Sequence, residues 1–333
     1  MTLMPIRSKG LVVTGVGRVE YGDIRVPEGC NTEVRIRARY SLMSLGTETS
    51  LANGHRMENS KFPYVPGYQG VGEIEWVGAA VEGHKVGDLV VYLGGQVEPK
   101  LNAVWGAHQE LIVCGTENLI PVPAGMDLKI AAVAPLFAVG MHGVDLAAVG
   151  PTDLLVVLGH GLVGAGVAQA ARARGARVLV SEPNPERRKL AELYGADWVV
   201  DPGERSVSEF LGERAGTDRA DVVVESSGNA ALIAEAIGLC RFGGKLVMQG
   251  WMPGEIGFSY MEAHRRQLTM FFPTGWGPAG MKEAALRLAA SGTMTVGPYI
   301  SHCARAADSA ILYEEALGPK RSEIVALVFQ WNV

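Results

Sequence analysis

Cysteine is scarce in this chain of 333 residues, and the few cysteines are not clustered. The four of them are far apart in the sequence and form no C-x-x-C pair: Cys30, Cys114, Cys240 and Cys303. Zinc sites and disulfide frameworks usually show closely spaced cysteines. We therefore expect each cysteine to fill a small apolar gap, without a metal or a disulfide.

Three further absences each exclude a class of protein. The formal net charge is −5 at pH 7, so the chain lacks the basic surface that nucleic-acid binding needs. No apolar run approaches the roughly 18 residues that a membrane span requires. The first residues, MTLMPIRSKGLVV, have neither the apolar core nor the cleavage site of a signal peptide. We expect a cytoplasmic enzyme that has no nucleic-acid or membrane partner.

A glycine-rich turn is the strongest positive signal in the sequence. The apolar run Leu154–Leu158 precedes Gly159, Gly161 and Gly164, spaced as G-x-G-x-x-G, and an alanine-rich segment follows. This order predicts a buried parallel strand, a tight turn and a helix whose N-terminus faces the pyrophosphate of a dinucleotide. Because the chain contains 43 glycines, the spacing alone also fits an ordinary βαβ unit. The predicted cofactor-binding residues of the turn are Gly159, His160, Gly161, Leu162, Val163 and Gly164.

The residues after the next apolar run predict which dinucleotide binds. Glu182 stands about 20 positions after the first glycine, where an acidic side chain holds the ribose hydroxyls of NAD and repels the 2′-phosphate of NADP. Arg187 weakens this argument, because an arginine at that edge can bind a phosphate or stack on adenine. We expect NAD, with NADP the less favoured cofactor. Three residues at the ends of later strands are expected to contact it as well: Ser226, Gly250 and Pro273.

The pattern of predicted strands and helices changes twice along the chain. Residues 1–137 contain short β-leaning runs separated by Gly, Pro and Asp, which is typical of a small barrel-like unit. Residues 138–274 alternate apolar strands with helical stretches, which predicts a doubly wound parallel sheet. Residues 275–333 contain one helix, short mixed elements and a final strand-like run. The expected fold class is therefore α/β, with a second, β-rich domain.

Several motifs together resemble the medium-chain dehydrogenase/reductase family over nearly the whole chain. The resemblance implies a GroES-like catalytic domain in residues 1–137, a Rossmann NAD(P)-binding domain in residues 138–274, and a return segment, residues 275–333, that completes the first domain. It also implies a homodimer. Motifs around Ser44–Glu48 and Gly250-Trp251 are most similar to the branch around bacteriochlorophyllide dehydrogenase and threonine dehydrogenase. The motifs that carry the family resemblance are Pro66–Glu73, Val86–Val90, Leu193–Asp197, Asp221–Glu225 and Phe242–Lys245.

The zinc ligands of the family are missing from this sequence. Zinc-dependent members take a Cys from the first motif, a His from Gly-His-Glu, and a later Cys or Glu. The corresponding residues here are Ser44 or Leu45, then Gly67-Tyr68-Gln69, then Pro135-Leu136-Phe137. None of these offers the thiolate, imidazole or carboxylate that zinc prefers. We predict that the protein binds no metal.

Without a metal, hydroxyl groups must hold the substrate oxygen. Thr47 matches the position of a family Ser or Thr that touches this oxygen, and Tyr68 replaces the ligand histidine. Tyr68 could donate to a developing alkoxide, or act as a base if its pKa were lowered; alternatively it only fills the volume of the lost metal site. Glu48 could relay protons, or it could pair with an arginine. His55 could extend that relay, or it could be a residue of a surface loop.

Four residues are expected to contact the substrate. Ser44 and Gln69 would face the oxygen, and Trp251 and Trp276 would supply apolar pocket walls, which suits a bulky or planar molecule. The reaction that we expect is the interconversion of a secondary alcohol and a ketone on a small-to-medium metabolite. The alternatives are NAD(P)H-dependent conjugate reduction of an enone, quinone or iminium, and a catalytically silent NAD(P)H-binding sensor or scaffold.

Overall fold

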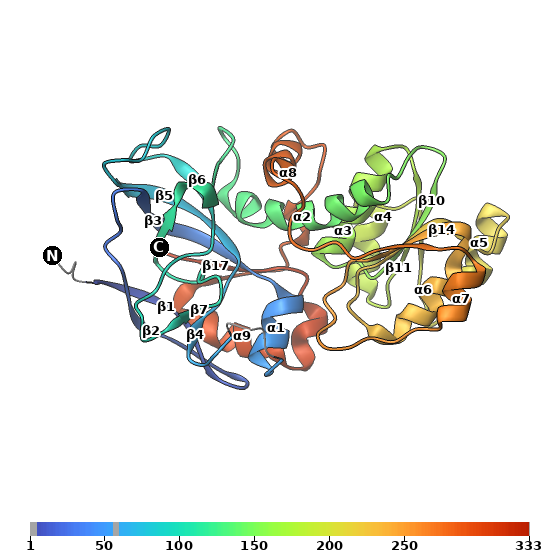
Figure 1. Ribbon diagram of the computed structural model, residues 1–333, viewed down its shortest axis with the longest axis horizontal. Coiled ribbons are helices and arrows are strands. Elements are labelled where there is room, and N and C mark those ends of the chain that lie inside the picture. The colour runs from blue at the N-terminus through green and yellow to red at the C-terminus, as the bar shows by residue number, and fades with distance from the viewer. Residues whose placement is uncertain (1–4, 56–59, 333) are drawn as a thin grey trace. The chain divides into compact units, whose positions relative to one another are not determined.

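The computed structural model describes residues 5–55 and 60–332, and the chain divides into two units (Figure 1). Unit 1 comprises Met1–Val133 and Ile300–Val333, and unit 2 comprises Ala134–Tyr299. Unit 2 is therefore inserted between two pieces of unit 1.

The boundaries between the units differ from those expected from the sequence. The first falls inside helix α2 (Leu128–Leu146), and residues 275–299 belong to unit 2 instead of to the return segment. Gln169 of helix α3 (Leu162–Ala173) explains the second difference, because its amide donates to the Thr295 carbonyl at 2.9 Å and accepts from the Thr295 N–H at 2.7 Å. These two bonds join the stretch to α3 of unit 2.

Unit 1 contains two sheets, and several of their strands have one buried face. Strand β3 shows the pattern, because Val34, Ile36 and Ala38 are buried and alternate with less buried polar residues. The larger sheet has the order β16-β17-β3-β5-β6-β9, with β8 also paired to β3, and the smaller has the order β2-β1-β4-β7. The strands are β1 (Ile6–Gly15), β2 (Arg18–Val26), β3 (Glu33–Met43), β4 (Tyr64–Val65), β5 (Gln69–Val77), β6 (Leu89–Leu93), β7 (Asn102–Ala103), β8 (Leu111–Gly115), β9 (Leu119–Pro121), β16 (His302–Arg305) and β17 (Leu327–Gln330).

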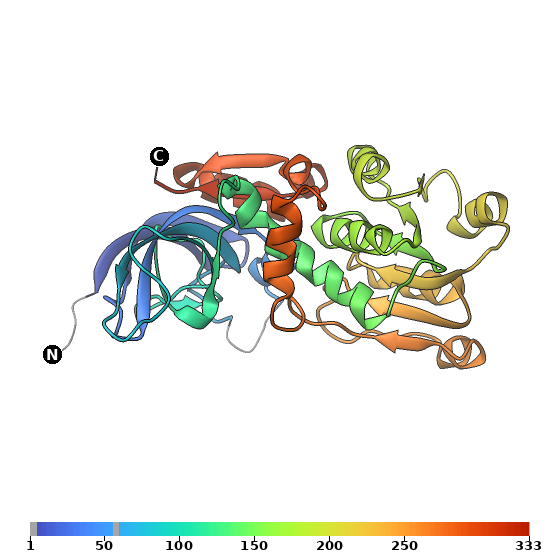
Figure 2. The same ribbon diagram turned by 90° about the horizontal axis from the view of Figure 1, so that it is seen from above.

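The C-terminal segment completes the larger sheet. β17 pairs antiparallel with β3, from Leu327 opposite Met43 to Gln330 opposite Tyr40. Figure 2 shows the red C-terminal segment beside the blue and cyan strands of the N-terminal residues. The helices of this unit are α1 (Leu45–Ala52), α9 (Ser309–Leu317) and the first turns of α2, with 3₁₀ turns η1 (Thr116–Asn118), η4 (Ala306–Asp308) and η5 (Pro319–Glu323).

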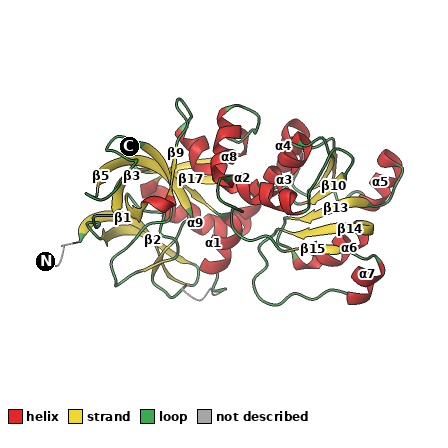
Figure 3. Ribbon diagram, turned by 45° about the horizontal axis from the view of Figure 1, so that its top comes forward, coloured by secondary structure: helices red, strands yellow, loops and turns green. Residues whose placement is uncertain are grey.

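Unit 2 is the predicted doubly wound sheet. Its six strands are all parallel, in the order β12-β11-β10-β13-β14-β15, which is the Rossmann order. Helices lie on both faces of the sheet (Figure 3). The elements are β10 (Leu154–Leu158), β11 (Arg177–Ser181), β12 (Trp198–Val200), β13 (Ala220–Glu225), β14 (Cys240–Met248), β15 (Thr269–Phe271), α3, α4 (Pro185–Tyr194), α5 (Val207–Ala215), α6 (Ile233–Leu239), α7 (Tyr260–Arg265), α8 (Met281–Ala290), η2 (Ala230–Leu232) and η3 (Gly297–Tyr299).

Helix α2 is the one described helix whose length and composition would let it cross a membrane. In the structure, 67% of the apolar 18-residue stretch of this helix is buried, and Pro135 lies inside the helix. This burial is that of a core helix in a packed protein.

Candidate active site

The glycine turn has the geometry that a dinucleotide site requires. Gly159 follows β10 with φ +91°, a conformation that side chains with a Cβ rarely adopt. A Cβ on Gly164 would overlap the Gly159 carbonyl and lie 2.8 Å from Ser226 Oγ, so α3 can approach the turn only with glycine there. Gly161 is the N-cap of α3, and a Cβ on it would meet no atom within 4 Å. The free N–H groups of this helix start fit a pyrophosphate.

Glu182 braces the turn from the end of β11. Its Oε2 accepts the His160 N–H at 2.6 Å, and its Oε1 accepts the Asn184 N–H at 2.9 Å. A carboxylate offers about four lone-pair positions, so two remain for the hydroxyls of a ribose. The neighbouring Arg188 donates to the Glu182 carbonyl at 2.9 Å and pairs with Asp201 at 2.8 Å, which makes it part of the structure.

The expected cofactor contacts that follow later strands lie at the same edge of the sheet. Ser226 follows β13 and its Oγ donates to the Gly159 carbonyl at 2.9 Å, so it holds the glycine turn in place. Gly250 follows β14, and its N–H donates to the Glu225 carbonyl at 2.8 Å. Pro273 follows β15. Because parallel strands end at one edge, these residues and the glycine turn border the same face of unit 2.

The His160 ring lies in the interior of unit 2. It is fully buried, and its Nε2 lies 3.0 Å from the Tyr299 hydroxyl. Burial, and then the charge of Arg187, lowers the pKa of His160 to about 3. Only the backbone of His160 is therefore placed to contact a cofactor, while its neutral ring packs in the core.

The low pKa of His160 makes unit 2 sensitive to acid. The unfolded chain binds a proton at the ordinary value of 6.5 and the folded chain does not, so stability is complete above pH 6.5 and falls as the pH drops toward 3. The expected loss is about 1.4 kcal/mol per pH unit in that window. We expect His160→Gln to remove this component, as measured by urea unfolding at several pH values, with the exposed His264→Gln as control. Equal pH slopes for His160→Gln and the unaltered protein would refute the assignment.

Three hydroxyl groups predicted from the sequence come together in unit 1. Ser44 is the N-cap of α1 and Thr47 lies in its first turn. The Tyr68 side chain, just before β5, forms hydrogen bonds with both of their side chains. The ring of Trp105 stands edge-on to Tyr68, with ring centroids 4.2 Å apart and an interplanar angle of 85°. We call Ser44, Thr47 and Tyr68 the hydroxyl cluster.

The surroundings of Tyr68 make it a donor and not a base. Burial raises the pKa of its phenol above the ordinary value of 10.0, the Thr47 hydrogen bond partly lowers it, and the Glu48 charge raises it again. The lowered pKa that a base would need is therefore opposed by the protein's own residues. A neutral phenol can donate its proton at physiological pH.

Glu48 is buried behind the hydroxyl cluster. It is 1% exposed, its Oε1 accepts the Ser44 N–H at 2.7 Å, and its Oε2 lies 3.0 Å from His108 Nε2 and 3.2 Å from the Tyr313 hydroxyl. The expected arginine is not among these partners. The partners described for the carboxylate are a backbone N–H, an imidazole and a phenol, all in unit 1.

Two of the expected site residues have other surroundings than the hydroxyl cluster. Gln69 is fully buried and its Nε2 donates to the Ala132 carbonyl of α2 at 2.6 Å. His55 is exposed after α1, and its Nδ1 lies 3.2 Å from the Ser50 carbonyl, as the surface-loop alternative expected. The structure describes no contact between His55 and the hydroxyl cluster.

Comparisons with known proteins agree with this geometry. The family model "Alcohol dehydrogenase GroES-like domain" matches residues 31–124, and the model "Zinc-binding dehydrogenase" matches residues 163–291. A probable D-xylulose reductase A from Arthroderma otae is 30% identical over 282 residues, which cover 78% of this chain and 79% of that protein. The chain belongs to the medium-chain dehydrogenase/reductase family. As a member of this family, it is an NAD(P)-dependent oxidoreductase.

Other medium-chain dehydrogenases show the same relationship. L-galactonate-5-dehydrogenase from Escherichia coli K12 is 28% identical over 285 residues, which cover 80% of this chain and 83% of that protein. Among solved structures, 2R,3R-butanediol dehydrogenase from Bacillus subtilis matches with a TM-score of 0.83 and 22% identity, covering 98% of this chain and all of that one. At that identity, the structural match supports the fold alone.

Zinc does not fit this medium-chain dehydrogenase at the family positions. Ser44 or Leu45, then Tyr68, and the segment Pro135-Leu136-Phe137 offer no side chain that binds zinc well. Across residues 5–55 and 60–332, no group of three or more His, Cys, Asp and Glu side chains could hold a metal ion. The described residues that remain at the site offer hydroxyl groups.

The partners of Glu48 are not apparent from the family motifs. His108 and Tyr313 come from segments far from α1, and neither lies in a motif that the family resemblance used. One signal was available: His108 and Gln109 form a polar pair just before the apolar strand β8. Such a pair beside a buried strand needs hydrogen-bond partners in the interior.

Proposed function

We propose that this chain is a zinc-independent, NAD-dependent oxidoreductase that interconverts a secondary alcohol and a ketone. The observation that carries the proposal is the hydroxyl cluster, in which a neutral Tyr68 stands at the family position of a zinc-ligand histidine and bonds Ser44 and Thr47. Hydroxyl donors can stabilise the negative charge that develops on a carbonyl oxygen during reduction. In this proposal, the protein works in the cytoplasm and its substrate is a small-to-medium organic molecule.

The residues of unit 1 would do the proton chemistry. Thr47 would donate to the substrate oxygen and orient it, while Tyr68 would give that oxygen its phenolic proton during reduction, after which a proton from solvent would restore the phenol. Ser44 would hold the Tyr68 hydroxyl in place. The bound nicotinamide supplies hydride transfer. Trp251, which is 40% exposed, and Trp276 would form apolar walls that favour a bulky or planar substrate.

We assign NAD and not NADP to unit 2 because of Glu182. A carboxylate that stands at the end of β11 would repel the 2′-phosphate of NADP. Arg188, which could offset this repulsion, is already bonded to Asp201 and to the backbone. Arg187 could then stack on the adenine.

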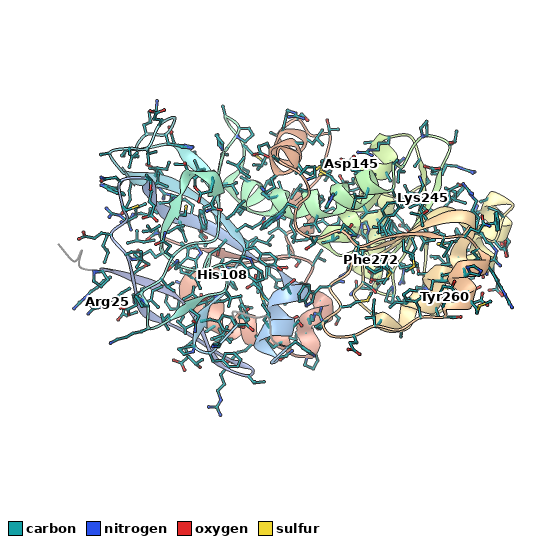
Figure 4. The ribbon with its side chains drawn as sticks, viewed as in Figure 1. Arg25, His108, Asp145, Lys245, Tyr260 and Phe272 are labelled. Carbon is teal, nitrogen blue, oxygen red and sulfur yellow. The ribbon has the colours of Figure 1, made fainter. Side chains whose placement is uncertain are left out.

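We also propose a homodimer formed through the edge of the sheet in unit 2. β15 is an edge strand that pairs only with β14 in the described sheet. Phe272, next to it, is 60% exposed, and Tyr260 of α7 is 68% exposed (Figure 4). An unpaired edge beside exposed aromatic rings favours association with a second copy. Light scattering behind a size-exclusion column tests this, and a monomer at micromolar concentration would exclude it.

The experiment that tests the proposed reaction starts with metal removal. We expect protein treated with a chelator to bind NADH and to oxidise it in the presence of a ketone, at a rate that added zinc leaves unchanged. A panel of ketones, enones and iminium compounds identifies the reaction class. Turnover of enones or iminium compounds alone would favour conjugate reduction, because such substrates are already electrophilic. Tight NADH binding without turnover of any compound would favour a sensor or scaffold.

A further inference from the structure

A row of buried side chains connects Trp331 to Glu48. Trp331 Nε1 donates to Ser41 Oγ at 2.8 Å, Ser41 Oγ lies 2.8 Å from His108 Nδ1, and His108 Nε2 lies 3.0 Å from Glu48 Oε2. All four residues are at most 1% exposed. His108 lies among the strands of unit 1 (Figure 4). The row therefore belongs to the core and not to the surface.

The hydrogen bonds of this row run in one direction. The Trp331 indole is only a donor, so the Ser41 oxygen accepts its proton and the Ser41 O–H remains free to donate. The partner described for that O–H is His108 Nδ1. His108 Nε2 then carries the ring proton and donates it to the Glu48 carboxylate. In this arrangement, every donor of the row has an acceptor.

Glu48 connects this row of hydrogen bonds to the hydroxyl cluster. Its second oxygen accepts the Ser44 N–H at 2.7 Å, and Ser44 is the N-cap at which α1 begins. The position of the carboxylate therefore fixes the first turn of α1. Ser44 and Thr47 in that turn both bond to Tyr68. A shift of Glu48 would move two of the three hydroxyl groups.

We propose that His108 is a positioning residue: by donating to Glu48, it fixes the first turn of α1 and so holds the Ser44 and Thr47 hydroxyls against Tyr68. The inference rests on the proposed function, because it names how the hydroxyl cluster of that function is held. Tyr313 also donates to Glu48, at 3.2 Å, but no described hydrogen bond connects it to His108, Ser41 or Trp331.

Two substitutions each remove one of the two hydrogen bonds of the His108 ring and keep the other. The amide of His108→Gln reaches the position of Nε2 and keeps a donor for Glu48, while it loses the partner of Ser41. The amide of His108→Asn stays at the position of Nδ1 and keeps the partner of Ser41, while it loses the donor for Glu48. His264→Asn, on an exposed histidine of unit 2, serves as the control. Circular dichroism and thermal unfolding establish that each variant folds.

Two readouts are measured on the full-length protein. The first is kcat for ketone reduction, which we expect to fall roughly 10-fold to 10²-fold in His108→Asn and to change little in His108→Gln, because small misplacements of catalytic groups are costly. The second is the NMR signal of the Tyr68 ring carbon that bears the hydroxyl, with carbon-13-labelled tyrosine and assignment by its loss in Tyr68→Phe. We expect this signal to move in His108→Asn and to stay in place in His108→Gln. The NADH affinity is expected to be equal in both.

The NMR readout keeps the two proposals distinct. If the Tyr68 signal behaves as expected while the unaltered protein reduces no ketone, the positioning by His108 stands and the proposed function fails. If both variants leave the signal and kcat unchanged, or change them equally, His108 is only a structural residue and the inference is overturned.

Discussion

Replacing Tyr68 by phenylalanine is expected to lower turnover by roughly 10²-fold, because the phenol is the proposed proton donor to the substrate oxygen. The NADH affinity should stay the same, since the Rossmann unit is untouched. Phenylalanine keeps the edge-on contact with Trp105 and loses the hydrogen bonds to Thr47 and Ser44. The cost in stability should therefore be small, about 1 kcal/mol per lost bond. Steady-state kinetics with NADH and any ketone from the panel measures the effect.

The control for this substitution is Tyr260→Phe, which removes a hydroxyl that is exposed on α7. The pH dependence gives a second check. Because the pKa of Tyr68 is raised above 10.0, its phenol stays protonated and reduction should not decline through loss of this donor below pH 10. A near-normal rate in Tyr68→Phe would remove the phenol from the mechanism and leave Thr47 as the candidate donor.

Replacing Glu182 by alanine is expected to weaken NAD binding by roughly 10-fold to 10²-fold, since hydrogen bonds to a charged group contribute about 1.5–3 kcal/mol each. Discrimination against NADP should decrease, because the negative charge at the end of β11 is removed. The His160 and Asn184 N–H groups also lose their acceptor, so the variant should be less stable than the unaltered protein. Titrations that follow NADH and NADPH fluorescence measure both affinities.

The matched variant for this prediction is Glu186→Ala, which removes an exposed carboxylate in the first turn of α4. It changes the net charge equally and leaves the glycine turn intact, so NAD binding should be unaffected. If the unaltered protein already prefers NADPH, then the interpretation of Glu182 is wrong.

The Rossmann unit could be predicted from the sequence because its signals are local. The run Leu154–Leu158 forms a strand with the predicted bounds and is buried throughout, and the glycine spacing specified the turn that follows it. The end of unit 2 could not be predicted in the same way. Residues before it bond to partners far away in the sequence, as Thr295 does to Gln169, and composition does not show such pairing.

Only those residues of the candidate site that lie in family motifs could be predicted from the sequence. Ser44, Thr47 and Tyr68 were found from those motifs, and the structure brings them together. The motif could not show that Gln69 points into the core, because a strand residue faces one side or the other according to the register of its sheet. His108 could not be identified in this way, because its partner Glu48 lies on another element.

The late position of β17 has a consequence for how the chain is made. β3 leaves the ribosome early, but the strand that covers its residues Tyr40–Met43 follows only after all of unit 2. Unit 2 is continuous, so it can fold as it emerges. During that time, part of an edge of β3 offers free N–H and C=O groups to any other chain nearby. Synthesis of this protein therefore includes a period in which this part of β3 can pair with another chain, and the period ends when β17 has been made.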